Sequence, residues 1–254
     1  MKPKQDAIVP KNILNLLTAS SRFDLWAGFI KQQKIKVIAE VGVYRGCFSQ
    51  FILKEYQGIE KYYMVDPWRQ LDRWCKPANH DNSRFESIMS EALDRNSRYM
   101  EKIKVLRGTT TEVIEAIADD ELDFAYIDGD HTLRGIAIDL VRVYPKIRVG
   151  GWLAGDDFSS SIWQHPTSYE PTLVFPFAVY FAEAVGARIY ALPHSQFLIE
   201  KQEVDEFEFF DLTGKYTDLS IKSHVGTVKI VLLNVLSFLP FSDAIFKVVR
   251  KFFQ

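Results

Sequence analysis

Hydrophobic residues follow two alternating patterns along this 254-residue chain. Short apolar runs, typical of buried strands, are separated by segments in which apolar residues recur every three or four positions, as on one face of a helix. The two patterns alternate about every 30 residues, which is the spacing of strand–helix–strand units with parallel strands. The chain therefore predicts an α/β fold built around a mostly parallel sheet.

The expected parallel strands start near residue 36 and continue at 62–65, 103–106, 122–127 and 151–154. Helical spacing is found at 11–33, 47–55, 82–93, 113–117, 133–144 and 173–185. Two further strands, 188–192 and 196–200, are joined by Pro193, His194 and Ser195 and predict an antiparallel hairpin at the sheet edge. Together these elements predict a doubly wound sheet of seven strands.

The pattern divides the chain into three regions: an N-terminal helical region at 1–34, a central domain at 35–210 and a C-terminal helical tail at 211–254. Within the tail, residues 225–239 are mostly apolar and 242–253 are amphipathic and basic. We expect a helical hairpin that packs on its own domain or on a second copy of the chain. The alternative is a basic helix that lies on an anionic membrane surface.

Composition narrows the classes of function. The chain is 47% hydrophobic and 25% charged, which supplies an ordinary core, and its net charge of -2 argues against a nucleic-acid partner. Its only cysteines, Cys47 and Cys75, are typical of a reducing compartment. The N-terminal residues are polar, and no apolar run reaches membrane-spanning length. We therefore expect a cytoplasmic protein, with peripheral membrane contact as the alternative.

A glycine-containing turn follows the first strand, and its spacing points to a nucleotide-type ligand. Gly42 and Gly46 flank Tyr44, and Asp66 ends the next strand, where a carboxylate can bind ribose hydroxyls. The dinucleotide motif G-x-G-x-x-G needs a glycine where Tyr44 stands, because a pyrophosphate must approach the backbone there. A ligand with ribose but no pyrophosphate fits better, and S-adenosylmethionine is the common example.

Three acidic residues follow the fourth and fifth strands. Asp128 ends the fourth strand, and Asp156 and Asp157 end the fifth. If these strands are neighbours, their carboxylates converge, and a hard cation offsets their repulsion. Oxygen ligands favour Mg²⁺, with Mn²⁺ or Ca²⁺ as alternatives. The competing interpretation is that Asp156 or Asp157 only caps a turn.

Two motifs carry a resemblance to known families. The loop at 40–49, EVGVYRGCFS, resembles the cofactor loop of catechol O-methyltransferases, which also have tyrosine in place of a glycine. Asp128-Gly129-Asp130-His131 with Gly155-Asp156-Asp157 resembles the metal-dependent sugar O-methyltransferases of the macrocin type. The resemblance covers about residues 35–201. It implies a class I S-adenosylmethionine-dependent methyltransferase with a Rossmann-like fold.

The resemblance also implies roles for individual residues. The glycines would line the methionine part of the cofactor, with a glutamate and a serine near its amino and carboxylate groups. Asp66 would bind the ribose, and the residues after it would border the adenine. The cofactor-binding residues expected on this basis are Glu40, Gly42, Tyr44, Gly46, Ser49, Asp66, Pro67, Trp68, Thr110 and Asp128.

For the chemistry, the same families imply that Asp128, Asp156 and Asp157 bind the metal. Asp130 matches the proposed base of the sugar enzymes, and His131 stands where the catechol enzymes have a catalytic lysine. A metal-bound hydroxyl would lose its proton to one of these two residues and then attack the methyl group. We favour Asp130, with His131 as the alternative.

The predicted function is a divalent-metal-dependent O-methyltransferase that acts on a hydroxyl of a sugar or glycosylated small molecule. The alternatives are a methyltransferase of phenols or catechols, a dinucleotide-dependent oxidoreductase and a non-catalytic protein that binds the cofactor. The expected partner is a small-molecule or glycan acceptor, and a homo-oligomer is an open alternative. The loops at 69–82 and 159–172, which include Lys76, would decide which acceptor is bound.

Overall fold

The structure, a computed structural model, describes residues 9–216 together with 231 and 235. Apart from residues 231 and 235, the C-terminal helices that the sequence predicts lie outside this part of the chain, and the domain boundaries drawn from the sequence stay predictions. None of the helices among the described residues is long and apolar enough to cross a membrane.

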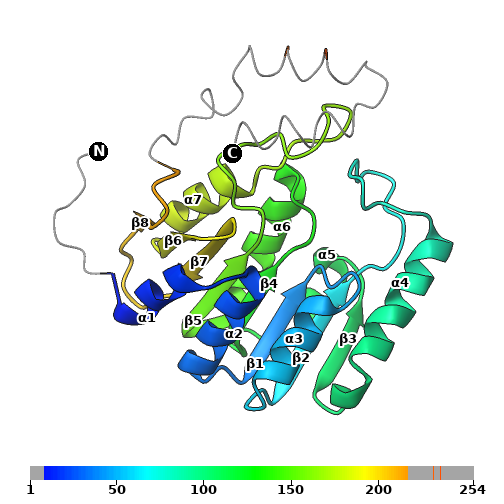
Figure 1. Cartoon of the computed structure of the whole chain (residues 1–254), viewed down its shortest axis with the longest axis horizontal. Helices are drawn as coiled ribbons and strands as arrows, with labels where there is room; N and C mark the ends of the chain where they lie inside the picture. Colours follow the sequence, from blue (N-terminus) through cyan, green and yellow to red (C-terminus); the bar gives the residue numbers. More distant parts are fainter. Residues whose placement is uncertain (1–8, 217–230, 232–234, 236–254) are drawn as a thin grey trace.

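The described residues are organised around one sheet of eight strands, in the order β3-β2-β1-β4-β5-β7-β6-β8 (Figure 1). Neighbouring strands from β3 to β5 run parallel, and β7 is antiparallel to both of its neighbours. The strands are β1 Val37–Val41, β2 Lys61–Asp66, β3 Ile103–Arg107, β4 Leu122–Ile127, β5 Ile147–Gly155, β6 Arg188–Leu192, β7 Gln196–Glu200 and β8 Glu208–Asp211. The prediction of a doubly wound, mostly parallel sheet with an antiparallel hairpin is confirmed.

One strand was not predicted. β8 pairs in parallel with β6, so it lies outside the β6–β7 hairpin and forms the edge of the sheet. Its four residues, EFFD, are all half-buried. Such a short run gives no periodic signal by itself, and only its pairing with β6 makes it a strand.

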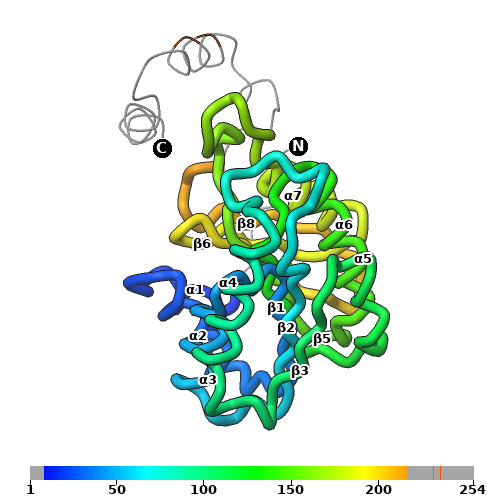
Figure 2. Tube along the Cα trace, turned by 90° about the vertical axis from the view of Figure 1, so that its right-hand side faces the viewer, coloured from blue at the N-terminus to red at the C-terminus, as the bar shows by residue number. Residues whose placement is uncertain are grey.

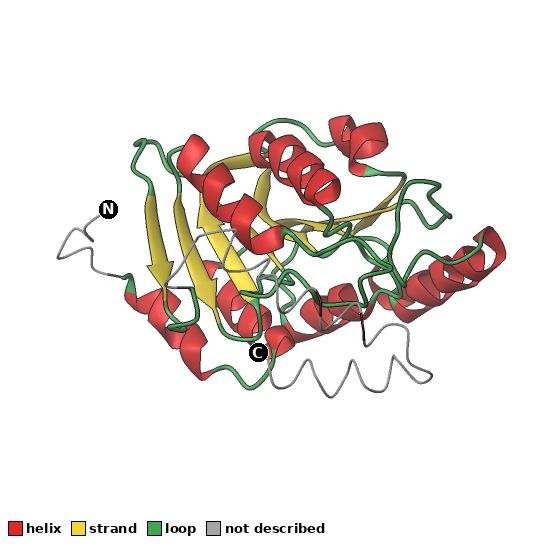
Figure 3. Ribbon diagram, turned by 90° about the horizontal axis from the view of Figure 1, so that it is seen from above, coloured by secondary structure: helices red, strands yellow, loops and turns green. Residues whose placement is uncertain are grey.

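Helices cover both faces of the sheet (Figures 2 and 3). The N-terminal helices, α3 and α4 share one hydrophobic core with one face, and α5, α6 and α7 share the other core with the opposite face. The α-helices are α1 Lys11–Leu14, α2 Arg22–Gln33, α3 Cys47–Glu55, α4 Asn82–Arg95, α5 Thr110–Val113, α6 Leu133–Val143 and α7 Val174–Ala184. Short 3₁₀ turns are η1 Asn15–Thr18, η2 Ser97–Tyr99, η3 Ile114–Ala116 and η4 Tyr144–Lys146.

The N-terminal helical pattern is interrupted. The spacing predicts helix over 11–33, but the helix ends in η1 and α2 begins at Arg22. Ser21 is the cause, because its extended backbone leaves the helical region and its hydroxyl accepts a hydrogen bond from the Asp24 amide. α2 then packs on the sheet through Trp26 and Phe29, which are both fully buried.

The order of the strands shows where the ligand crevice of the fold lies, between β1 and β4. β1 and β4 are neighbours, and the chain proceeds outward from them in opposite directions, to β2 and β3 on one side and to β5 on the other. In open α/β sheets a ligand site forms at such a reversal, beyond the carboxyl ends of the strands. The glycine turn, Asp66 and the three acidic residues all follow these carboxyl ends.

Candidate active site

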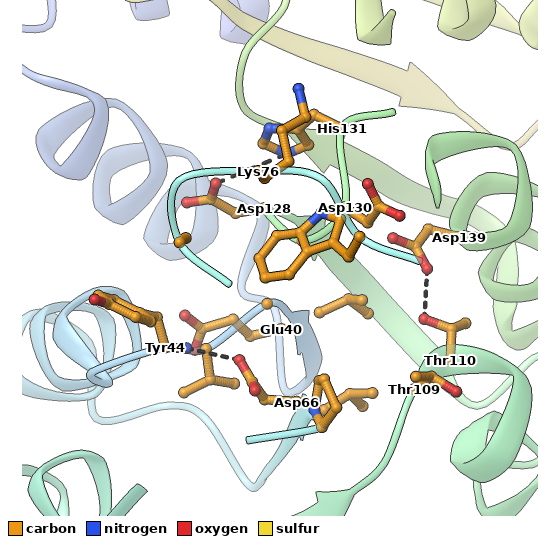
Figure 4. Close-up of a pocket in the computed structure, with 18 of the residues that line it drawn as sticks. Glu40, Tyr44, Asp66, Lys76, Thr109, Thr110, Asp128, Asp130, His131 and Asp139 are labelled. Atoms are coloured by element: carbon orange, nitrogen blue, oxygen red, sulfur yellow. Dashed lines mark hydrogen bonds and ion pairs between the residues drawn. The ribbon is translucent and has the colours of Figure 1, made fainter. Parts of the chain in front are cut away.

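A cavity of about 610 Å³ opens at the carboxyl ends of β1, β2 and β4. This volume lies within the range of small-molecule sites. Glu40, Tyr44 and Asp66 lie toward one end of it, and Asp130, His131 and Lys76 lie toward the other (Figure 4).

The turn after β1 approaches the turn after β4 at backbone contact. Gly42 has a φ of +91°, and a Cβ at this position would lie 2.2 Å from the carbonyl oxygen of Asp128. The Asp128 amide in turn donates to the Val41 carbonyl at 2.8 Å. Only glycine fits at position 42, because any side chain would collide with the Asp128 backbone. The two turns therefore pack backbone against backbone, and their outer surface is open to a ligand.

Asp66 is held by backbone amides at the floor of the cavity. Its two carboxylate oxygens accept hydrogen bonds from the amides of Tyr44 and Trp68, each at 2.8 Å. Burial raises the pKa of Asp66, and these amide hydrogen bonds work in the opposite direction. The carboxylate therefore ties the glycine turn to the end of β2, with its position set by the backbone.

Glu40 is a buried acid near the carboxyl end of β1. It is 2% exposed, lines the cavity and accepts a hydrogen bond from the Tyr62 hydroxyl at 2.9 Å. Burial raises the pKa of Glu40 to about 8, although the hydrogen bond from Tyr62 favours the charged form. A buried carboxyl of this kind is suited to a ligand ammonium group, which would supply the missing positive charge.

Most of the residues predicted for the cofactor line this cavity. They are Glu40, Gly42, Tyr44, Asp66, Pro67, Thr110 and Asp128. The other predicted residues, Gly46, Ser49 and Trp68, lie behind its wall. The Ser49 hydroxyl donates to the Gly46 carbonyl at 3.2 Å, and the fully buried Trp68 indole donates to the Tyr44 carbonyl at 2.8 Å. These three residues hold the shape of the turn from behind.

Asp139 is a cavity residue that the sequence reasoning missed. It lies on α6, is 6% exposed and accepts a hydrogen bond from the Thr110 hydroxyl (Figure 4). Burial raises the pKa of Asp139 to about 7. The signal was present in the sequence, because Asp139 lies on the face of the helix that carries Ile136 and Leu140, where a charged residue is unusual.

The acidic residues after β4 and β5 come together, as predicted, but each is engaged by another side chain. The Arg22 guanidinium lies 3.0 Å from Asp128 Oδ2 and also pairs with Asp156 Oδ2. Asp156 accepts a second hydrogen bond at Oδ1 from the Gln196 amide. Asp156 does not line the cavity, whereas Arg22 and Asp128 do.

Asp157 pairs with His131. The two side chains meet at 2.6 Å between Nδ1 and Oδ2. His131 is 8% exposed and lines the cavity, and its other nitrogen, Nε2, is buried without a hydrogen-bond partner and lies 3.8 Å from Asp128 Oδ1. Burial lowers the pKa of His131, but the charge and hydrogen bond of Asp157 outweigh burial and raise it above its ordinary value. The pair holds the imidazole at Nδ1 and leaves Nε2 without a hydrogen bond.

Asp130 also lines the cavity, but part of its carboxylate serves the start of α6. Its Oδ1 accepts the Thr132 amide at 3.0 Å. Its side chain also packs on Gly135, where a Cβ would lie 2.1 Å from the Asp130 Cγ. The structure thus brings both candidate bases to the cavity. His131 has a ring nitrogen, Nε2, without a hydrogen bond, whereas one oxygen of Asp130 is already bound to the Thr132 amide.

The predicted metal ligands do not fit a divalent ion in this arrangement. Asp128 and Asp156 share the Arg22 guanidinium, and Asp157 is bound to His131. Among residues 9–216, 231 and 235, the structure places no three His, Cys, Asp or Glu side chains where they could hold a metal ion. The three acids gather at the strand ends, but the expected magnesium site is not confirmed.

Two loops meet over the cavity. Lys76, in the loop after β2, is 7% exposed and donates from Nζ to the Glu170 carbonyl at 2.9 Å and to the Thr172 hydroxyl at 3.2 Å. Lys76 and Thr172 both line the cavity, as does Trp74. The loops that the sequence singled out for the acceptor are therefore joined to each other at the cavity itself.

Comparisons with known proteins agree with this geometry. Residues 39–158 match a family model described as a methyltransferase domain. Over 167 residues the chain is 23% identical to the uncharacterized protein y4gI of Sinorhizobium fredii (strain NBRC 101917 / NGR234). That alignment covers 61% of this chain but 17% of y4gI, so the chain spans about a sixth of that protein's length.

Solved structures show the same fold. A Staphylococcus aureus protein described as a candidate caffeoyl-CoA O-methyltransferase superposes with a TM-score of 0.52 at 15% identity, over 74% of this chain and 87% of that one. The O-methyltransferase TomG of Streptomyces achromogenes, solved in complex with SAM and involved in tomaymycin synthesis, gives 0.50 at 10% identity, over 77% and 91%. Residues 39–158 therefore resemble a methyltransferase domain, and the solved structures show that the chain shares the fold of these proteins.

Proposed function

We propose that this protein is an O-methyltransferase that moves the methyl group of S-adenosylmethionine to a hydroxyl of a sugar or glycosylated small molecule. The observation that carries this proposal is the composition of one cavity. It is lined at one end by the glycine turn and Asp66, and at the other by His131 with an unpartnered Nε2. A ribose-binding end and a proton-accepting end within one cavity suit methyl transfer to oxygen.

The cofactor end has the groups that S-adenosylmethionine needs. Glu40 would face the amino group, Asp66 would accept hydrogen bonds from the ribose hydroxyls, and Thr110 with Asp139 would lie beside the adenine. When bound, the cofactor supplies an electrophilic methyl group on a sulfonium. The protein must then place an oxygen in line with that methyl group and remove its proton.

His131 is the base that this geometry favours. Asp157 holds the Nδ1 side of the ring, so Nε2 is left to take the hydroxyl proton of the acceptor. With the cofactor bound, the acceptor oxygen would take the methyl group from sulfur, and the products would be the methyl ether and S-adenosylhomocysteine. Asp130, the base favoured from the sequence, is the alternative, although one of its oxygens is already bound to the Thr132 amide.

A sugar acceptor is supported by the side chains at the far end of the cavity. Lys76, Asp130 and Thr172 can exchange hydrogen bonds with several hydroxyls, and Trp74 offers an aromatic face. A phenol or catechol would use fewer of these polar groups. Both classes belong in the same acceptor panel, which decides between them.

Dependence on Mg²⁺ or Mn²⁺ stays a prediction from the sequence. What supports it is the gathering of three carboxylates after β4 and β5, and what opposes it is their pairing with Arg22 and His131. A chelator decides the matter. Methyl transfer that stops in EDTA and returns with Mg²⁺ would establish the ion, and full activity in EDTA would remove it from the reaction.

The proposed function is tested by calorimetry and by methyl transfer. Purified protein should bind S-adenosylhomocysteine and not NAD⁺, and it should transfer labelled methyl groups from S-adenosylmethionine to members of a panel of nucleotide sugars, glycosides and phenols. Binding of NAD⁺ alone would favour the oxidoreductase alternative. Cofactor binding without transfer to any hydroxyl would favour the non-catalytic alternative.

A further inference from the structure

Arg22 occupies the place between the acidic strand ends where the sequence led us to expect a metal ion. It is the first residue of α2, and its Nη1 contacts carboxylate oxygens of both Asp128 and Asp156. A positive charge at a helix N-terminus is unfavourable toward the helix dipole. This position is therefore stabilised by the two carboxylates and not by the helix.

The contacts of Asp156 indicate that it is committed to the protein. Its Oδ2 pairs with Arg22 and its Oδ1 accepts the Gln196 amide. Gln196 is fully buried, and its side-chain oxygen is held by the Trp26 indole at 2.7 Å and the Tyr126 hydroxyl at 3.0 Å. Each group in this series of hydrogen bonds has a partner. Asp156 could therefore not turn toward an ion without leaving buried donors unpaired.

The third acid is engaged as well. Asp157 Oδ2 contacts His131, and the side-chain amide of Gln164, oriented to donate, lies 3.0 and 3.2 Å from the two oxygens of Asp157. A metal ion that took all three carboxylates would break the His131 contact and displace Arg22. The guanidinium is a permanent charge with several fixed donors, so it can compensate two carboxylates at once.

We propose that Arg22 replaces a divalent ion at the ends of β4 and β5, so that this enzyme methylates its acceptor without a metal. This inference rests on the proposed function for its catalytic part, but the metal-binding part stands by itself. Arg22 acts as a positioning residue. It compensates the charge of Asp128 beside His131 and keeps the acidic residues from repelling one another or attracting an ion.

The decisive experiment measures Mn²⁺ binding directly, by calorimetry and by the Mn²⁺ electron paramagnetic resonance signal, on metal-free full-length protein. The variants are Arg22→Ala and Arg22→Lys, with Arg148→Ala as the matched control. Arg148 also pairs with an aspartate, Asp123, but neither residue lines the cavity. Binding of S-adenosylhomocysteine reports that each variant is folded.

The wild type, Arg22→Lys and Arg148→Ala are expected to bind no Mn²⁺ at millimolar concentration. Arg22→Ala is expected to gain a Mn²⁺ site, because it leaves Asp128 and Asp156 without their cation. In EDTA the wild type should keep its methyl transfer, and Arg22→Ala should lose about tenfold or more in kcat, since the charge beside the reacting atoms is no longer compensated. Part of this loss should return with Mn²⁺.

Stoichiometric Mn²⁺ binding by the wild type, together with loss of its activity in EDTA, would overturn the proposal. So would an Arg22→Ala variant that folds, binds no Mn²⁺ and keeps full activity in EDTA. If Arg22→Ala does not fold, the wild-type measurement decides by itself. If no acceptor is methylated by any variant but Arg22→Ala alone gains Mn²⁺, the proposed function fails and the role of Arg22 at the acidic strand ends stands.

Discussion

The two ends of the cavity are built in different ways. At the cofactor end, backbone groups supply the contacts that define the turn, as between the Tyr44 amide and Asp66, 22 residues apart. At the acceptor end, the contacts join side chains that are distant in sequence, as between Arg22 and its partners Asp128 and Asp156, 106 and 134 residues away. One end is defined by a turn, and the other by the meeting of charged side chains.

This difference affects what can be predicted from the sequence. A backbone site needs small residues at fixed positions, such as Gly42, and therefore leaves a motif in the sequence. A side-chain site needs compensated charges, and the compensating group can come from any element that reaches the place. The acceptor end therefore leaves a weaker motif in the sequence than the cofactor end.

The largest effect is expected at the acceptor end, from His131→Ala. Loss of the base should lower kcat by about 10²- to 10⁴-fold while S-adenosylhomocysteine binds as before. Asp157→Asn should lower kcat less, because the ring stays but its orientation is no longer held. Steady-state kinetics and calorimetry measure both effects.

His194→Ala is the control for this experiment, because His194 bonds the Ala19 carbonyl and does not line the cavity. If His131→Ala keeps its full kcat while Asp130→Asn loses it, the base is Asp130. The acceptor end would then depend on the strand-end motif more than on the His131–Asp157 pair.

Glu40→Gln probes the cofactor end, where binding should suffer more than kcat. The amide cannot offer a negative charge to the amino group of the cofactor, so the Kd for S-adenosylhomocysteine should rise about 10- to 100-fold. Isothermal calorimetry measures this, and kcat at saturating cofactor should change little. A variant with unchanged Kd would show that Glu40 does not face the amino group.

The free energy of unfolding should depend on pH mainly through the buried acids of the cofactor end. Its pH dependence therefore separates the two ends of the cavity. The folded pKa values are about 8 for Glu40 and about 7 for Asp139, both above the ordinary values of 4.5 and 3.8. The folded protein therefore holds more protons than the unfolded chain between about pH 4 and 8, and the free energy of unfolding should fall as pH rises through this window.

Denaturant unfolding of the cofactor-free protein at a series of pH values measures this slope, and Glu40→Gln or Asp139→Asn should flatten it. Glu121→Gln is the control. Hydrogen bonds from Lys61 and Tyr63 lower the pKa of Glu121 to about 2 against the opposing effect of burial, so its contribution should be constant above about pH 6, where the unfolded glutamate is also ionised. A slope that survives both Glu40→Gln and Asp139→Asn would contradict the assignment.

The smallest effect is expected where the two loops meet. Lys76→Met removes the hydrogen bonds to Glu170 and Thr172 and should raise the KM for the acceptor about two- to tenfold, with little change in kcat. Lys36→Met, at an exposed lysine paired with Glu60, should change neither constant. A large loss of kcat in Lys76→Met would place this lysine in the chemistry rather than in acceptor binding.

Most of the fold could be predicted because its signals are local. Strand and helix periods located the parallel strands, and Pro193, His194 and Ser195 marked the turn of the hairpin that the structure contains. β8 was missed because four residues carry no period, and the break before α2 was missed because the apolar spacing continues across Ser21. In the first place the pairing with β6 decides the structure, and in the second the cap formed by Ser21 does.

The candidate site was predictable where it depends on motifs. Gly42 and Asp66 line the cavity, as the glycine turn and the end of β2 predicted. Asp130 and His131 line it as well. Arg22 and Asp139 were missed, although each breaks a local rule, one as a cation at a helix N-terminus and the other as an acid on an apolar helix face. Such exceptions to local rules are the signals that could have found them.

The amino-acid sequence by itself determined the order of strands and helices, the glycine turn and the acids at the strand ends, because these follow from backbone conformation and side-chain period. Only the tertiary structure decided which charge meets those acids. Sequence motifs describe what a segment offers, but charge compensation depends on distance in space, and α2 brings Arg22 to strand ends more than a hundred residues away.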